Sequence, residues 1–394
     1  MASKKRSTGV GDRCGPQGYE NWRLASKGEP AQSAVEIPLY SDTSVSGEVT
    51  EGWGPYKVFN TISAAHGPAC LPVLVLRASW HLGQISLIGA EETDTSRFHG
   101  GSIYDEIASI LGLKLGIRLR ASSVTRSIYP DLRPERPIAE DPASVPTLPL
   151  RNQGRPSNLD NPRHAKVEAA ALERYARMRP RDAVALARAA RLYQSALWTC
   201  DADPSNAWLM LVSAIEVVSV EWRMSTTDGD PTTLLRALKP EWVERLNAAG
   251  GEELVGYMAS QWVDLLKATD RFLKFMVAHM PGPPERRPPV YKVDWDPAAM
   301  KKAMCFIYDK RSEALHGGIP FPTPMCSPPV RVTADSDASN ERPIGLASQA
   351  LGAVYMQADF PMHMHIFAHI VRGAILKWWD TLPDEEAVVG EENA

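Results

Sequence analysis

Residues 183–222 read AVALARAARLYQSALWTCDADPSNAWLMLVSAIEVVSVEW, and this stretch decides the fold of the C-terminal half. Its apolar residues recur three and four positions apart, first in residues 183–197 and again in residues 208–222. That spacing places them on one face of an α-helix, so two helices are predicted. Between them, Asp203 is a candidate helix cap and Pro204 suits a first helical position, which predicts an antiparallel helical hairpin.

Helical patterns continue downstream of this hairpin. Four further helices are predicted over residues 234–248 with a break at Pro240, 252–280, 297–315 and 359–381. Two proline-rich stretches, 281–289 and 317–343, separate some of them. We therefore expect an all-α bundle over residues 164–385, followed by an acidic tail over residues 386–394.

The pattern upstream is different. Short runs rich in branched and aromatic residues alternate there with Gly, Pro, Ser and Asp, which is typical of β-strands, over residues 35–40, 57–62, 71–80 and 85–88. Ser102 then precedes an apolar pattern with helical spacing. The predicted fold class is α+β: a flexible N-terminus over residues 1–33, a mixed α/β region over 34–125, a proline-rich linker over 126–163, and the bundle.

Composition excludes several classes of protein. The chain has 43 basic and 47 acidic residues and a net charge of −4, which argues against nonspecific coating of nucleic acid or membrane. Its five cysteines show no CxxC spacing, so neither a disulfide framework nor a cysteine zinc site is indicated. The start lacks the apolar stretch of a secretory signal, and the longest apolar run, residues 207–222, carries two glutamates. We expect a cytoplasmic location and no membrane partner.

The segment RSEALHGG, residues 311–318, holds the strongest candidate chemistry. On a continuous helix Arg311 and His316 point about 140° apart, so we expect Gly317 and Gly318 to distort the helix end and let them converge. Cleavage of RNA by its own 2′-hydroxyl needs a proton acceptor, a proton donor and a fixed positive charge. Histidine and arginine supply these without a metal or another cofactor. The alternative is a structural role, because a histidine near a helix C-terminus is favoured by the helix dipole.

Residues 308–317, YDKRSEALHG, resemble the signature of HEPN domains, in particular the Apea-like branch, in which an arginine and then a histidine followed by glycine end a bundle helix. Residues 208–218 are similar to an earlier helix of that family, which carries an acidic residue, here Glu216. The resemblance implies a helical bundle that forms a homodimer, with the two Arg-His motifs facing one composite cleft. For many members it also implies metal-independent endoribonuclease activity in toxin, antiphage or stress systems.

The resemblance further implies that Arg311 binds the scissile phosphate of RNA and that His316 carries the proton transfer, with an antitoxin or regulatory protein as a candidate partner. Ser312 stands where many nuclease members have Asn, Asp or His, and it can donate or accept one hydrogen bond. The competing hypothesis is a noncatalytic module that dimerises or binds RNA, a nucleotide or a protein, in which the motif merely ends a helix.

Glu216 lies in an apolar stretch, where an unpaired carboxylate is costly to bury. It is expected to find a cation or a donor, and Arg311 is the partner we predict. A pairing unrelated to the motif and simple exposure to solvent are the alternatives. Glu216, Tyr308 and Ser312 together form the predicted supporting residues of the motif.

A basic stretch covers residues 151–191, with ten Lys or Arg against four Asp or Glu and a local net charge of +6. Within it, a set of arginines recurs at spacings of three, four and seven: Arg174, Arg177, Arg181 and Arg188. Several of them are expected on one helix face, either as an RNA-binding surface or as an ordinary solvated surface.

Three histidines stand in the segment PMHMHIFAHI: His363, His365 and His369. The last two are four apart, the spacing with which two imidazoles chelate one metal on a helix. Because no further ligand follows in the motif, we predict a partly buried helix face and no metal site. Motifs of the GxxxxGK[ST], GxSxG and HExxH types do not occur in the chain.

Overall fold

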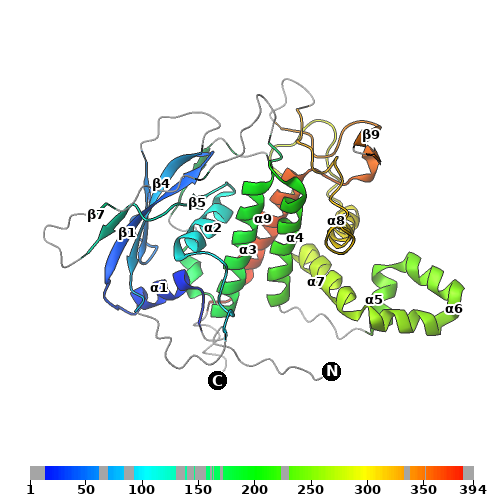
Figure 1. The fold of residues 1–394 in the computed structure, drawn as a ribbon, viewed down its shortest axis with the longest axis horizontal. Coiled ribbons are helices and arrows are strands. Elements are labelled where there is room, and N and C mark those ends of the chain that lie inside the picture. Colours follow the sequence, from blue (N-terminus) through cyan, green and yellow to red (C-terminus); the bar gives the residue numbers. More distant parts are fainter. Residues whose placement is uncertain are drawn as a thin grey trace. The chain divides into compact units, whose positions relative to one another are not determined.

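The computed structural model describes residues 14–61, 70–83, 93–129, 138–139, 146, 157–159, 162, 164–168, 172–222, 230–331, 338–350 and 352–384. The protein is mixed α+β, as predicted (Figure 1). It divides into two compact units: unit 1 comprises Met1–Met210 and Trp379–Ala394, and unit 2 comprises Leu211–Trp378. This division differs from the predicted boundary at residues 126–163. Most of that stretch, the predicted strand 85–88 and the predicted tail 386–394 lie outside the described residues.

An antiparallel sheet forms the core of unit 1 together with its helices. Its strands run in the order β3 (Tyr56–Asn60), β4 (Leu71–Trp80), β1 (Ser33–Ser41), β6 (Arg126–Ile128) and β7 (Ile138–Ala139), and β5 (Arg120–Ala121) also pairs with β1. Strand β4 has the predicted bounds. A separate parallel pair joins β2 (Ser44–Ser46) to β8 (His164–Lys166), so the prediction that every element beyond residue 163 is helical is wrong at β8.

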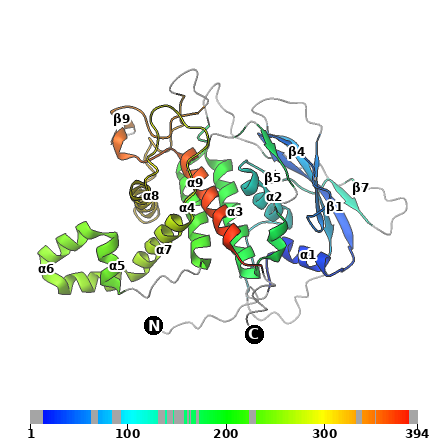
Figure 2. The ribbon, with the colours of Figure 1, turned by 180° about the vertical axis from the view of Figure 1, so that it is seen from behind.

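Helix α2 (Ile103–Leu115) lies against the sheet in both views (Figures 1 and 2). It begins as the sequence predicts, because the Ser102 hydroxyl accepts from the Asp105 backbone N–H while the Asp105 carboxylate accepts from that of Ser102. Gly116 ends the helix at φ 70°, a conformation that glycine adopts without steric cost. Side chains such as Ile107 and Leu111 are buried.

Helix α1 (Gln17–Ser26) corrects the prediction that residues 1–33 are flexible. Its Tyr19 and Trp22 side chains are buried in unit 1. The fully buried Glu106 carboxylate accepts hydrogen bonds from the backbone N–H groups of Gly18 (2.8 Å) and Tyr19 (2.9 Å), at the positive end of the helix dipole. This long-range cap orders a segment whose own composition indicates disorder.

The helices predicted around the quoted stretch are present as α3 (Pro180–Thr199) and α4 (Pro204–Glu221). The Asp203 carboxylate accepts from the backbone N–H of Asn206 at 3.0 Å, which confirms the predicted cap. Helix α3 begins at Pro180, and a short 3₁₀ helix, η3 (Glu173–Arg177), precedes it.

A buried arginine joins three parts of unit 1. Arg118 has no exposed surface and pairs with Asp42 at 2.7 Å and with Asp201 at 2.6 Å. Its Nε also donates to the Leu197 carbonyl at 2.6 Å. Because both carboxylates are largely buried, the three charges depend on one another for compensation.

Unit 2 is mostly helical. Beyond its part of α4 it holds α5 (Pro231–Leu238), α6 (Pro240–Gln261), α7 (Val263–His279), α8 (Pro297–Gly317) and α9 (Met364–Thr381) up to Trp378. The predicted break at Pro240 is confirmed, and α6 is interrupted at Gly250 and Gly251, between the predicted helices 234–248 and 252–280.

Three predictions for unit 2 need correction. The predicted helix 252–280 ends near Trp262 and restarts, because Trp262 has nonhelical dihedral angles. The predicted start of the last helix at residue 359 is wrong, since a 3₁₀ turn, η4 (Gln357–Asp359), comes before α9. Strands β9 (Ala347–Ala350) and β10 (Ala353–Met356) form an antiparallel hairpin, so this part of the chain is not all-α.

Candidate functional site

The predicted catalytic residues lie on one helix of unit 2, α8. Asp296 caps its start, where the carboxylate accepts from the backbone N–H of Ala298 at 2.9 Å, and Pro297 takes the first helical position. The helix then runs unbroken to Gly317, and Gly318 ends it in the left-handed conformation, with φ 65°. Arg311 and His316 therefore belong to the same continuous helix.

Glu216 of α4 receives two hydrogen bonds from α8. Arg311 Nη2 donates to Glu216 Oε2 at 2.7 Å, and the Tyr308 hydroxyl donates to Glu216 Oε1 at 2.9 Å. The Arg311 and Glu216 side chains are only 18% and 23% exposed, so their ion pair is largely shielded from water. The predicted pairing of Glu216 with Arg311 is thus present, and each carboxylate oxygen has a donor.

Tyr308 packs beneath this pair. Its side chain is 2% exposed, and the centroid of its ring lies 4.8 Å from that of Phe272 on α7. The guanidinium carbon of Arg311 lies 5.6 Å from the centroid of the Tyr308 ring. Burial first, and then the neighbouring Glu216 carboxylate, raise the pKa of the Tyr308 phenol. The phenol therefore stays protonated at neutral pH and acts as a hydrogen-bond donor to Glu216.

Other charges on α8 are also paired. Lys239 Nζ lies 2.6 Å from Asp309 Oδ1, and Lys310 Nζ lies 2.8 Å from Glu313 Oε2. The sequence analysis missed both pairs. The pair Lys310–Glu313 has a local signal, since Lys and Glu three positions apart share a helix face. The pair Lys239–Asp309 joins residues 70 positions apart and has no such signal.

His316 does not converge with Arg311 within one chain, which corrects the prediction of a distorted helix end. The left-handed residue is Gly318, and it follows His316, so the two side chains keep their helical separation of about 140°. His316 is exposed and makes no hydrogen bond with any other described residue. Ser312 is half-buried on the same helix.

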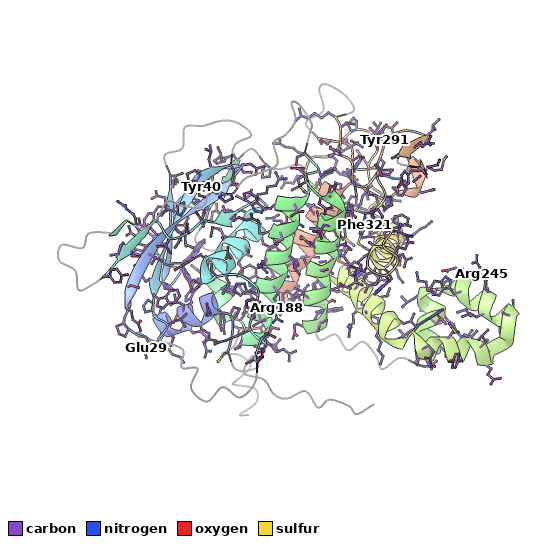
Figure 3. The ribbon with its side chains drawn as sticks, viewed as in Figure 1. Glu29, Tyr40, Arg188, Arg245, Tyr291 and Phe321 are labelled. Carbon is purple, nitrogen blue, oxygen red and sulfur yellow. The ribbon has the colours of Figure 1, made fainter. Side chains whose placement is uncertain are left out.

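The four arginines of the basic stretch, several of which were expected on one helix face, are divided between two helices. Arg174 and Arg177 belong to η3, whereas Arg181 and Arg188 belong to α3 beyond the break at Pro180. Arg174 donates to backbone carbonyl oxygens near the end of α9. Arg188, labelled in Figure 3, donates to three carbonyl oxygens of residues 95–98. The side chains of Arg174 and Arg188 thus donate hydrogen bonds to the backbone of neighbouring segments of the same chain.

Of the three histidines, His365 and His369 lie on α9, whereas His363 directly precedes the helix. His363 is buried and His365 is half-buried, and loss of contact with solvent lowers the pKa of His363 to about 4 and that of His365 to about 3. His369 Nε2 lies 2.9 Å from the Gly282 carbonyl oxygen. In the part of the chain that the structure describes, no group of three His, Cys, Asp or Glu side chains is placed to hold a metal ion.

Comparison with known proteins adds no relative: no protein-family model, no curated protein and no solved structure matches the chain. None of the helices in the described ranges is long and apolar enough to cross a lipid bilayer.

Proposed function

We propose that the protein is a metal-independent endoribonuclease of the HEPN type, acting in the cytoplasm as a homodimer on RNA. One observation carries this proposal: Glu216, which also accepts from Tyr308, holds Arg311 in a fixed position on the helix that carries His316 in its last turn. An arginine oriented by a carboxylate offers a phosphate group a rigid set of donors that stays charged. An exposed histidine offers a proton acceptor or donor near neutral pH.

The divergence of the two side chains within one chain favours a composite site. In such a site Arg311 contacts a nonbridging oxygen of the scissile phosphate. His316 takes the proton from the RNA 2′-hydroxyl, whose oxygen attacks phosphorus. The bond from phosphorus to the 5′-oxygen then breaks, and the partner subunit's His316 donates a proton to that leaving oxygen. The products are a 2′,3′-cyclic phosphate and a 5′-hydroxyl.

The biological part of the proposal is a toxin, antiphage or stress-response role, regulated by an antitoxin or another protein. RNA cleavage inside a cell needs such control. The charge balance of the chain supports a local RNA site over general nucleic-acid coating, since its net charge is −4.

A second candidate function is a noncatalytic module that dimerises or binds RNA, a nucleotide or a protein. Two observations favour it. The charge of Arg311 is already balanced by Glu216, and the residue after Arg311 is a serine. In that case the motif serves to lock α8 against α4.

A reaction carried out in excess EDTA distinguishes the two candidates. We expect the purified protein to cleave an RNA oligonucleotide and to leave 2′,3′-cyclic phosphate ends, because the 2′-hydroxyl is the nucleophile. An oligonucleotide with a single 2′-deoxy position at the cleavage site is the matched control and is expected to resist cleavage there. An intact RNA substrate in the presence of folded, dimeric protein contradicts the nuclease and supports the noncatalytic module.

A further inference from the structure

A cavity of about 140 Å³ lies in unit 1, between α2, the segment Leu119–Ala121 and α3. This volume exceeds the roughly 30 Å³ that one water molecule occupies in the liquid. The polar residues that line it come from all three elements: Asp105, Ser109, Arg120, Arg191, Gln194 and Ser195. Trp198 contributes the large aromatic part of the wall.

Two arginines of the wall have donors to spare. Arg120 is exposed, and its guanidinium carbon lies 4.7 Å from the centroid of the Trp198 ring. Arg191 donates from Nη1 to the His99 carbonyl oxygen at 2.9 Å. Within the described ranges, neither arginine forms an ion pair with a carboxylate. Both guanidinium groups therefore keep a net positive charge beside the cavity.

Uncharged donors line the same space. Ser109 and Ser195 line the cavity, and their hydroxyl groups make no hydrogen bond within the described part of the chain. A serine hydroxyl can donate one hydrogen bond. An anion in the cavity therefore supplies an acceptor for both hydroxyl groups.

The one acid of the wall is already in use. The Asp105 carboxylate accepts from the backbone N–H of Ser102 at 2.9 Å and from its hydroxyl at 2.8 Å, as the capping box of α2. With Arg120 and Arg191 positive and Asp105 negative, the charged side chains of the wall sum to +1. The cavity is therefore suited to a negative ligand.

We propose that this cavity binds a phosphate group. A tetrahedral phosphate presents several acceptor oxygens. Arginine forks match their geometry, and the serine hydroxyls supply the shorter contacts. The group can be free phosphate or the terminal phosphate of an RNA strand. The cavity lies wholly in unit 1 and shares no residue with the Arg311–His316 motif, so the inference does not depend on the proposed nuclease.

The test is isothermal titration of the full-length protein with inorganic phosphate at constant ionic strength, up to about 10 mM, a range that saturates a site with a Kd near 1 mM. We expect one site per chain. Arg120→Gln and Arg191→Gln are each expected to raise the Kd about tenfold or more, because each removes charge-assisted hydrogen bonds. Ser195→Ala, which removes one hydroxyl group of the wall, is expected to raise it about two- to tenfold. Arg245→Gln, on α6 of unit 2, is the control and keeps the wild-type Kd (Figure 3).

Titration with RNA oligonucleotides that carry either a 5′-phosphate or a 5′-hydroxyl identifies the source of the group. Tighter binding of the phosphorylated strand, lost in Arg120→Gln, supports an RNA end as the ligand. Equal binding of both strands, with free phosphate still bound, supports the free ion. The proposal is overturned if wild-type protein shows no saturable phosphate binding, or if the two arginine variants, folded by circular dichroism, bind phosphate as tightly as wild type does.

Discussion

Replacing Glu216 with glutamine is expected to lower the free energy of unfolding by about 2–3 kcal/mol. The glutamine carbonyl still accepts from the Tyr308 hydroxyl, but its amide NH₂ group cannot accept from Arg311 Nη2. Breaking a fully buried ion pair costs about 3–5 kcal/mol, and one charge-assisted hydrogen bond is worth about 1.5–3 kcal/mol. Because the two side chains are 18% and 23% exposed, we place the cost near the boundary between these ranges.

The assay is a double-mutant cycle built on chemical denaturation. The free energy of unfolding is measured for wild type, Glu216→Gln, Arg311→Gln and the double variant, with fluorescence and circular dichroism as independent probes of the transition. We expect a coupling energy of about 2 kcal/mol between the two positions. Tyr308→Phe is the control for the second hydrogen bond, and it is expected to cost about 1–2 kcal/mol.

A small coupling energy refutes this reasoning. Residues that do not interact have additive effects within about 0.5 kcal/mol. A coupling below that limit means that Glu216 does not hold Arg311 in solution. Arg311 would then lack the fixed position on which its proposed contact with phosphate depends.

Two further predictions concern stability. Arg118→Met is expected to cost about 3–5 kcal/mol in chemical denaturation, because Asp42 and Asp201 lose their shared cation, and a cost below about 1 kcal/mol contradicts the burial of that cluster. The free energy of unfolding is also expected to fall as pH drops below about 6.5, because the unfolded chain then protonates His363 and His365 while the folded state keeps them neutral. In the folded state the pKa is about 4 for His363 and about 3 for His365. The loss of stability therefore stops growing only below these pH values, where the folded protein binds the protons as well. At pH 5 the loss amounts to about 2 kcal/mol for each histidine. If a His365→Leu variant loses stability with pH as the wild type does, the lowered pKa of His365 is contradicted.

Elements with a local signal could be predicted from the sequence. Strand β4 follows an apolar run bounded by turn residues, and α2 begins at a serine that forms a capping box. The start of α4 follows from Asp203 and Pro204, and the ion pair of Glu216 follows from the cost of burying a lone carboxylate. In each of these cases the residues that determine the feature lie close together in the sequence, or, for Glu216, a single arginine is the expected ion-pair partner.

Elements that depend on distant residues could not be predicted. Helix α1 is ordered by the Glu106 carboxylate, which lies 88 positions beyond Gly18. The divergence of Arg311 and His316 depends on which of two adjacent glycines ends α8, and the sequence alone does not decide between them. The phosphate cavity is likewise invisible in the sequence, because α2, β5 and α3 each contribute part of its wall.

The most direct test of the central claim compares RNA cleavage in excess EDTA by wild type, Arg311→Ala and His316→Ala at matched dimer content. Arg245→Ala, on α6, serves as the control for loss of a surface arginine. We expect the wild type and the control to cleave RNA, with rates about 10²–10⁴-fold lower when His316 is removed and about 10²–10³-fold lower when Arg311 is removed. Cleavage that persists at the wild-type rate in both variants, or a folded wild-type dimer that cleaves no RNA, contradicts it.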